Sequence, residues 1–228
     1  MTAHSSDLLA ELASFDTPGI CNGLEILDPA FTLYSYTKDY LMCSHPDRPA
    51  RIGYAKVAQI RTTRTHGESA ADLKDRRVAY YDYVAESEGP TICIHQDMDG
   101  PAGIAACWGD VMANVHFSLG VVGVVTNGAI RDIPGMPDGI QMLAGGEKPS
   151  HGELHMVSYG GTVQVAGLTI SDGDLVHMDR NGAAVIPHAL AADLPAAVRQ
   201  VGDKEQAIIR AAQKGRSGWP EVRKLMGG

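Results

Sequence analysis

The sequence predicts an α/β fold with a central, mostly parallel sheet in a single domain that ends in a helical tail. Residues 91–95 and 121–126 are short runs rich in β-branched side chains, the composition of strands covered on both faces. Residues 108–119, between them, have a helical pattern and are followed by Gly120, a residue typical of helix ends. Strand, helix and strand in this order form the unit from which parallel sheets are built.

Helix-capping residues and the spacing of apolar residues predict the elements that precede this unit. Residues 6–12 and 18–26 are expected to form two short helices, the second with Asp16 and Thr17 in its capping zone. Residues 28–50 are expected to be irregular, and residues 53–61 alternate as a half-buried strand does. Ser69 is a candidate cap for a helix that runs to about residue 86.

The central helix is expected to begin at Trp108 and to bury one apolar stripe. Val111, Met112, Val115 and Leu119 recur at helical spacing and define that stripe. His116 lies near it and is interpreted as a packing residue.

The second half of the chain is expected to form a compact β layer followed by the C-terminal helix. The predicted strands cover residues 154–157, 162–165, 174–178 and 183–187. Residues 189–214 have the composition and period of a helix, with Leu194, Val198, Val201 and Ile208 on one side. We find no repeat or low-complexity linker, so residues 1–228 are expected to form one domain, a length that one core can serve.

Composition excludes several classes of protein. The formal net charge is -8 and no run of basic residues occurs, which argues against a nucleic-acid surface. No apolar window approaches the length of a membrane span, and the first residues do not resemble a signal peptide. The 4 cysteines lack CxxC spacing, so we expect free thiols in a reducing compartment and a cytoplasmic protein.

Two potential anion-binding segments are expected to meet at one edge of the sheet. A right-handed crossover brings the start of the helix near Gly109 and the loop after Thr126 to the same edge. Backbone N–H groups of Gly109, Asp110, Val111 and Met112 would then face a carboxylate at the positive end of the helix dipole.

The loop after Thr126 adds the charged part of the predicted site. Arg131 offers a planar pair of donors that match a carboxylate, and Asp132 offers hard oxygen ligands suited to Mg²⁺ or Mn²⁺. Asp110 is placed to hold a water bound to the metal. The alternatives are that Asp110 is only a helix N-cap and that Arg131 and Asp132 form an ordinary ion pair in a loop.

Other reactive side chains have weaker support. Lys56, in a predicted strand, is the one lysine held in reserve for Schiff-base chemistry. His155 and His177 are considered as lining residues, with a structural histidine as the alternative. Cys107 precedes the helix start but has no identifiable base, so a thiol nucleophile is not favoured.

Several segments together resemble one known family. They are WGDVM at 108–112, GVVTNGAIRD at 123–132, AGLTISDGDLVHMDRNG at 166–182 and VIP at 185–187. In this order and spacing they are similar to the RraA-like family, and the resemblance covers about residues 10–190. It implies a swivelling β/β/α fold that assembles as a trimer or a dimer of trimers, with sites at the subunit interfaces.

The family resemblance also implies two functions. One is a class II, metal-dependent pyruvate aldolase acting on 4-hydroxy-4-methyl-2-oxoglutarate, with oxaloacetate decarboxylase activity, in which C–C cleavage gives a pyruvate enolate. Gly109 to Met112 and Arg131 would then hold the substrate, and Asp132 would hold the divalent metal. The other is a regulator that binds ribonuclease E, or another protein, without turnover. A different lyase, isomerase or hydratase that shares the enolate also stays open.

The resemblance does not extend to every part of the expected site. Residues 133–159 are rich in Met and His and lack the Arg-rich pattern of the better-known aldolases. The group that would recognise the far end of the substrate is therefore not identified by the sequence.

Overall fold

The computed structural model describes residues 3–31, 35–64, 67–100 and 103–227, so Met1 and Thr2 of the expected single domain lie outside it. Its main sheet has the order β1-β7-β5-β3-β2-β12-β13, and β9 also pairs with β2. The neighbours β7, β5, β3 and β2 are parallel, and the outer strands pair antiparallel. This confirms the mixed α/β prediction. The strands are β1 (Met42–Cys43), β2 (Arg51–Arg61), β3 (Thr91–Asp97), β5 (Val121–Thr126), β7 (Gln141–Ala144), β9 (His155–Tyr159), β12 (Leu175–Asp179) and β13 (Gly182–Ile186).

The strands of the second half do not form one separate layer, so that prediction was wrong. β9, β12 and β13 join the main sheet, and only β10 (Thr162–Val165) and β11 (Leu168–Ser171) form a hairpin apart from it. A third, parallel sheet consists of β4 (Ala106–Trp108), β6 (Ala129–Ile130) and β8 (Gly146–Glu147). Alternation along a segment indicates a strand but not which partner it pairs with, because pairing is a long-range choice.

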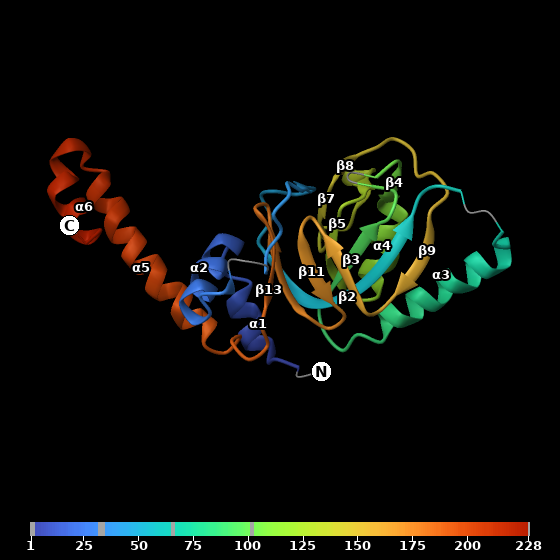
Figure 1. Cartoon of the computed structure of the whole chain (residues 1–228), viewed down its shortest axis with the longest axis horizontal. Coiled ribbons are helices and arrows are strands. Elements are labelled where there is room, and N and C mark those ends of the chain that lie inside the picture. Colours follow the sequence, from blue (N-terminus) through green and yellow to red (C-terminus); the bar gives the residue numbers. More distant parts are fainter. Residues whose placement is uncertain (1–2, 32–34, 65–66, 101–102, 228) are drawn as a thin grey trace.

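Helices α2 and α3 begin where the caps at Asp16 and Ser69 predicted. α1 (Ser6–Leu12) and α2 (Thr17–Leu27) lie beside β12 and β13, and Asp16 accepts a hydrogen bond from the backbone N–H of Gly19. α3 (Ala70–Ala85) starts after Ser69, whose hydroxyl accepts the N–H of Asp72. Figure 1 shows α3 lying along the face of the sheet near β9. Each cap satisfies an N–H that the helix itself leaves unpaired.

β2 is buried on both faces, whereas its alternating pattern predicted a half-buried strand. Ala58 and Ile60 pack into the cluster that includes side chains of α3, and Ala55 and Val57 pack on the opposite side with residues of the β10–β11 hairpin. The strand lies between β3 and β12 at the centre of the sheet. Central strands of covered sheets have no solvated face, so small residues such as alanine occupy both sides.

The central helix, α4 (Asp110–Ser118), is shorter and differently oriented than predicted. Trp108 belongs to β4, and Gly109 is the N-cap. The buried residues are Ala113 and His116, while Val111 is 73% exposed and Val115 is 39% exposed. The predicted apolar stripe was therefore wrong at Val111 and Val115, whereas Met112 and Leu119 are partly buried and pack against the core. The spacing of apolar residues does not reveal the buried face of α4, because the largest buried side chain on that face is His116. His116 is polar and has its hydrogen-bond partners inside the protein.

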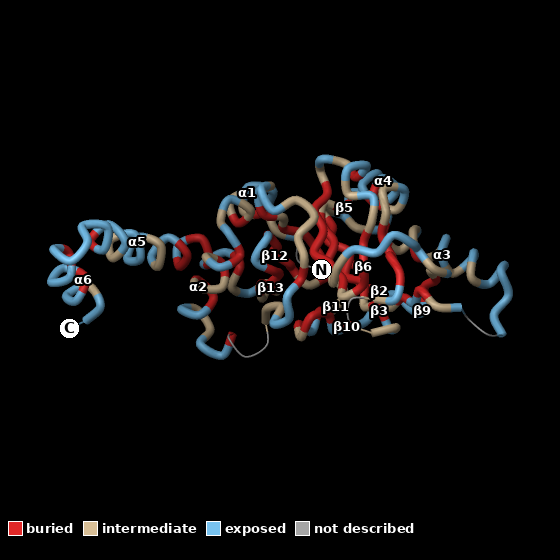
Figure 2. The backbone as a smooth tube through the Cα atoms, turned by 90° about the horizontal axis from the view of Figure 1, so that it is seen from above, coloured by how far each residue is buried: buried red, intermediate tan, exposed pale blue. Residues whose placement is uncertain are grey.

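The C-terminal helices extend away from the body of the molecule (Figure 1). α5 (Leu194–Ala212) packs its first turns on α2, where Gly23 lets Val198 approach closely, and a short 3-10 turn (Gly215–Gly218) leads to α6 (Trp219–Leu225). Figure 2 shows that the far part of this arm is largely exposed and that the buried residues concentrate in the body. No helix among the described residues is both long and apolar enough to span a membrane.

Two buried histidines are held neutral in the folded protein. His177 on β12 lies 3.0 Å from the Thr17 hydroxyl and 3.2 Å from the Leu12 carbonyl oxygen. Burial lowers the pKa of His177 to about 4, and burial likewise lowers the pKa of His116 to about 4. The ordinary value for histidine is about 6.5, so both side chains resist protonation in the native state.

We predict that the protein loses stability as pH falls from about 6.5 to about 4. The unfolded chain takes up protons on these histidines in that window and the native state does not, so the free energy of unfolding decreases by roughly 3 kcal/mol for each. Urea unfolding at pH 7.5, 6.0 and 5.0 measures the effect. His177→Gln should flatten the pH dependence and the exposed His151→Gln should not; an unchanged slope in His177→Gln contradicts the prediction.

Candidate active site

A cavity of about 660 Å³ lies at the N-terminus of α4. One wall consists of the segment from Trp108 to Met112 together with Arg131. The opposite wall comes from α3 and from residues 151–154. The structure therefore brings together the two segments that the sequence predicted would meet, the helix start and the loop after Thr126.

The small β4–β6–β8 sheet is what joins these two segments. Trp108 pairs with Ile130, and the backbone N–H of Arg131 donates to the Trp108 carbonyl at 2.9 Å. A Cβ added to Gly109 would lie 3.4 Å from Nε of Arg131, so the missing side chain leaves room for the guanidinium. Strands of two or three residues have no clear sequence signal, so this pairing was not predicted.

The N-terminus of α4 presents backbone donors at the cavity. Gly109 is the N-cap and has no side chain to cap the helix. Asp110 is the first helical residue, so the alternative that it is the N-cap was wrong; its carboxylate accepts the N–H of Val111 at 2.8 Å. First-turn N–H groups of a helix lack partners within the helix and favour an anion.

Arg131 and Asp132 form an ion pair beside this helix start. Nε of Arg131 lies 3.3 Å from Oδ2 of Asp132, with the side chains 34% and 46% exposed. At this exposure the pair contributes little to stability. Asp132 has φ 58° and ψ 35°, a left-handed conformation that is uncommon outside glycine and concentrates at functional sites. The backbone N–H of Gly135 donates to the Asp132 carbonyl and closes the turn that follows.

The oxygen ligands at this turn fit a hard divalent cation. The Asp132 carboxylate is accessible, and Asp110 packs against the same turn, since a Cβ on Gly135 would lie 3.2 Å from Oδ2 of Asp110. Mg²⁺ commonly uses one or two carboxylates and keeps several waters. Asp132 is at the margin of the cavity rather than among its lining residues.

A buried hydrogen-bonded chain lies behind the cavity. The Trp108 indole N–H donates to Nδ1 of His95 at 3.1 Å, so the other ring nitrogen of His95 donates to the Tyr80 oxygen at 2.6 Å. Nδ1 of His116 lies 2.8 Å from the Met112 carbonyl and must donate to it, so Nε2 of His116 accepts the Tyr80 hydroxyl at 2.9 Å. An indole can only donate and a carbonyl can only accept, which determines both tautomers.

This cluster also contains the one group of three possible metal ligands among the described residues: Cys93, His95 and His116. The Tyr80 oxygen occupies the middle of the group and is hydrogen-bonded to both imidazoles, with the Cys93 sulfur 3.7 Å away. Burial raises the pKa of Cys93 to about 12, so its thiol stays protonated. We interpret the cluster as a structural network, because its polar groups are satisfied without a metal.

Of the residues with weaker sequence support, Cys107 lines the cavity and the others do not. His155 lies in β9 and His177 faces Thr17, and neither lines the cavity. Lys56 is buried with its ammonium 4.1 Å from the centre of the Tyr83 ring and does not line the cavity either. Cys107 lines the cavity, but burial raises its pKa to about 12, which opposes a thiolate nucleophile. The histidine at the cavity is His151.

One supporting contact was missed by sequence reasoning. Asn127 bonds to the backbone of Asp97 in both directions, accepting its N–H at 2.8 Å and donating to its carbonyl at 2.9 Å. This ties the end of β3 to the loop that leads to Arg131. The Asp97 carboxyl is buried, burial raises its pKa, and its Oδ2 has no partner among the described residues. An Asn-Gly pair directly after a buried strand was the available signal.

The fold is that of a mixed α/β protein, and its candidate site combines a helix start that lacks an N-cap side chain with an adjacent Arg-Asp pair. Residues 30–185 match the model of the RraA-like family, described as Aldolase/RraA, and the chain belongs to that family. A protein of Marinomonas sp. (strain MWYL1) named "Putative 4-hydroxy-4-methyl-2-oxoglutarate aldolase" is 36% identical over 89 residues. That match covers 38% of this chain and 55% of the relative, about half its length.

Solved structures share the fold at low identity. An uncharacterized protein from Pseudomonas syringae pv. tomato str. DC3000 has a TM-score of 0.73 at 20% identity, covering 98% of this chain and 95% of that one. RraAS2 of Streptomyces coelicolor, titled an unusual member of the RNase ES inhibitor RraA protein family, has a TM-score of 0.67 at 20% identity, covering 95% and 100%. These similarities confirm the predicted fold.

We predict that Tyr80→Phe destabilises the protein by roughly 2–4 kcal/mol. The substitution leaves the N–H of His95 without an acceptor and Nε2 of His116 without a donor, and each unsatisfied buried group costs about 1–3 kcal/mol. Chemical denaturation measures the change. Tyr81→Phe, on the same helix, removes a hydroxyl outside this network and is the control; equal stability of the two variants contradicts the prediction.

Proposed function

We propose that the protein is a divalent-metal-dependent lyase that cleaves a C–C bond of a small oxo-acid and releases pyruvate. The observation that carries the proposal is Arg131, placed beside the uncapped N-terminus of α4 and next to the accessible carboxylate of Asp132. The substrates we infer are 4-hydroxy-4-methyl-2-oxoglutarate and oxaloacetate. The family membership and the aldolase name of the Marinomonas relative support this class of reaction.

The residues have distinct roles in this proposal. The N–H groups in the segment Gly109 to Met112 bind the substrate carboxylate together with the guanidinium of Arg131, in competition with the Asp110 carboxylate for the N–H of Val111. Arg131 also stabilises the negative charge that develops on the 2-oxo oxygen. Asp132 would hold Mg²⁺ or Mn²⁺, with Asp110 bonding to water around the ion. When bound, the ion supplies Lewis-acid stabilisation of the enolate.

The bond changes are the same for both substrates at the pyruvyl end. In the retro-aldol reaction the 4-hydroxyl loses its proton, the C3–C4 bond breaks, and its electron pair forms the enolate. In the decarboxylation the same bond breaks and CO₂ leaves. A proton added at C3 then gives pyruvate. Both reactions need stabilisation of one oxyanion, which is the task that the cationic Arg131 side chain suits.

We predict metal-dependent release of pyruvate that Arg131→Ala reduces by about two to three orders of magnitude in kcat, the usual effect of removing an oxyanion stabiliser. Asp132→Ala should abolish the response to added Mg²⁺ or Mn²⁺. The assay couples pyruvate to lactate dehydrogenase with each substrate, with the metal or with EDTA.

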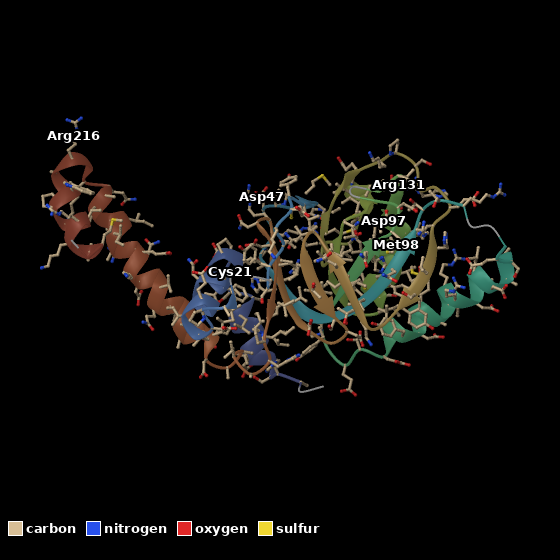
Figure 3. All side chains as sticks on the ribbon, in the orientation of Figure 1. Cys21, Asp47, Asp97, Met98, Arg131 and Arg216 are labelled. Carbon is tan, nitrogen blue, oxygen red and sulfur yellow. The ribbon has the colours of Figure 1, made fainter. Side chains whose placement is uncertain are left out.

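The controls are charge-matched substitutions away from the cavity. Arg216→Ala removes an arginine at the far end of the C-terminal arm, and Asp47→Ala removes an acid on the other side of the body from α3 (Figure 3). Both should keep wild-type rates. No release above the metal-only background from either substrate contradicts the proposed activity.

The alternative function, a regulator without catalytic turnover, leads to a different prediction. A protein that binds ribonuclease E or another partner through its surface should do so in the presence of EDTA and after Asp132→Ala. A pull-down with and without the chelator, done beside the pyruvate assay, separates the two functions. We also propose a homotrimer or a dimer of trimers, which light scattering coupled to size-exclusion chromatography tests directly.

A further inference from the structure

The cavity has a second wall whose chemistry the pyruvyl end does not use. Arg77, Val78 and Tyr81 of α3 face the segment that holds Gly109 and Arg131 across about 660 Å³. A pocket of this size holds more than a pyruvyl group, since ligand pockets of roughly 300–1,000 Å³ take much larger molecules. The part of the substrate beyond the bond that breaks is therefore expected to lie against α3.

Arg77 is the available cation on this wall. Its neighbour Arg76 is bonded to the Glu68 carboxylate and to the Met156 carbonyl, and Arg64 pairs with Glu153 at 3.6 Å. Arg77 has no hydrogen bond or ion pair to any residue that the structure describes. A guanidinium that lines a cavity and has no carboxylate partner is suited to bind one from a ligand.

Arg77 and Tyr81 both line the cavity from the same face of α3, four residues apart. Burial raises the pKa of the Tyr81 hydroxyl, and the positive charge of Arg77 partly opposes that rise. Arg77 is exposed, so a ligand reaches it without rearrangement of the core.

The loop of residues 151–154 completes this wall and is held in place by its backbone. The N–H of Glu153 donates to the Thr62 carbonyl at 2.8 Å, and the N–H of Ala106 donates to the Ser150 carbonyl at 2.7 Å. Gly152 has φ +56°, and a Cβ there would lie 2.4 Å from the Thr62 oxygen, so only glycine fits. His151 is thereby placed at the cavity on the same side as Arg77.

We propose that Arg77 binds the second carboxylate of an oxo-dicarboxylic substrate and determines selection against oxo-acids that lack this group. The substrate's 2-oxo-acid end lies at Arg131 and its distal carboxylate lies at Arg77, and the apolar residues that line the same cavity include Met112 and Leu154. This inference rests on the proposed function and names the specificity residue that residues 133–159 did not reveal.

A pair of ligands of equal length isolates this contact without requiring turnover. 2-Oxoglutarate and 2-oxopentanoate have the same five-carbon chain and differ in a terminal carboxylate or methyl group. We expect the wild-type protein with Mg²⁺ to bind 2-oxoglutarate about 10- to 100-fold more tightly in calorimetric titrations, the ratio that a charge-assisted hydrogen bond supports. Arg77→Ala should weaken only 2-oxoglutarate and remove the preference.

Two further variants serve as controls. Lys74→Ala removes the same charge from an exposed position of the same helix that does not line the cavity, and it should keep the preference. Arg77→Lys keeps the charge but loses the planar pair of donors, so it should retain part of the preference. In the pyruvate assay, Arg77→Ala should raise KM for 4-hydroxy-4-methyl-2-oxoglutarate with little change in kcat.

The outcomes distinguish this inference from the proposed activity. A wild-type protein without preference for 2-oxoglutarate, a preference that survives Arg77→Ala, or an equal loss for both ligands overturns the role of Arg77, even if pyruvate is released. If Arg77→Ala removes the preference and Lys74→Ala keeps it, the role of Arg77 is supported, even if neither aldolase substrate is cleaved.

Discussion

The buried chain from Trp108 through His95, Tyr80 and His116 to the Met112 carbonyl is the constraint on which the site depends. Its members come from β4, β3, α3 and α4, so one network joins four elements around the cavity. Every member is neutral: burial lowers the pKa of both histidines and raises that of Tyr80 far above its usual range. A low-dielectric interior strengthens such bonds and makes each unpaired group costly, so the elements hold one arrangement.

The charged side chains of the site, Arg131 and Asp132, are not part of this neutral network. Trp108 has its indole N–H in the buried chain and also lines the cavity, while Gly109, directly after it, approaches Arg131. The network therefore determines the orientation of the first turn of α4, and that turn determines where an anion can bind. Arg131 and Asp132 are accessible, which lets a ligand or a cation compete for their mutual ion pair. The buried part of the site is neutral and hydrogen-bonded, and the part with Arg131 and Asp132 is charged and accessible.

The two ends of the cavity differ in how they are built. The end at Arg131 rests on the β4–β6 pairing and on the Asn127 contacts with β3, so the backbone places it. The end at Arg77 rests on one long side chain from the exposed face of α3. A backbone-built subsite suits the group common to all 2-oxo-acids, and a side-chain subsite is easily changed by substitution. Under the proposed function, a substitution at Arg77 would change selectivity among substrates while the subsite at Arg131 is kept.

The sequence by itself determined the α/β class, the caps at Asp16 and Ser69, the β-branched strand β5 and the Arg131–Asp132 site candidates, because these depend on local composition and spacing. Only the tertiary structure decided that β2 is buried on both faces, that Val111 of α4 is exposed and His116 is hydrogen-bonded to Tyr80, and that Arg77 shares a cavity with Arg131. Each of these depends on contacts between residues far apart in the chain. A buried polar side chain has the same local pattern as an exposed one until its hydrogen-bond partners are known.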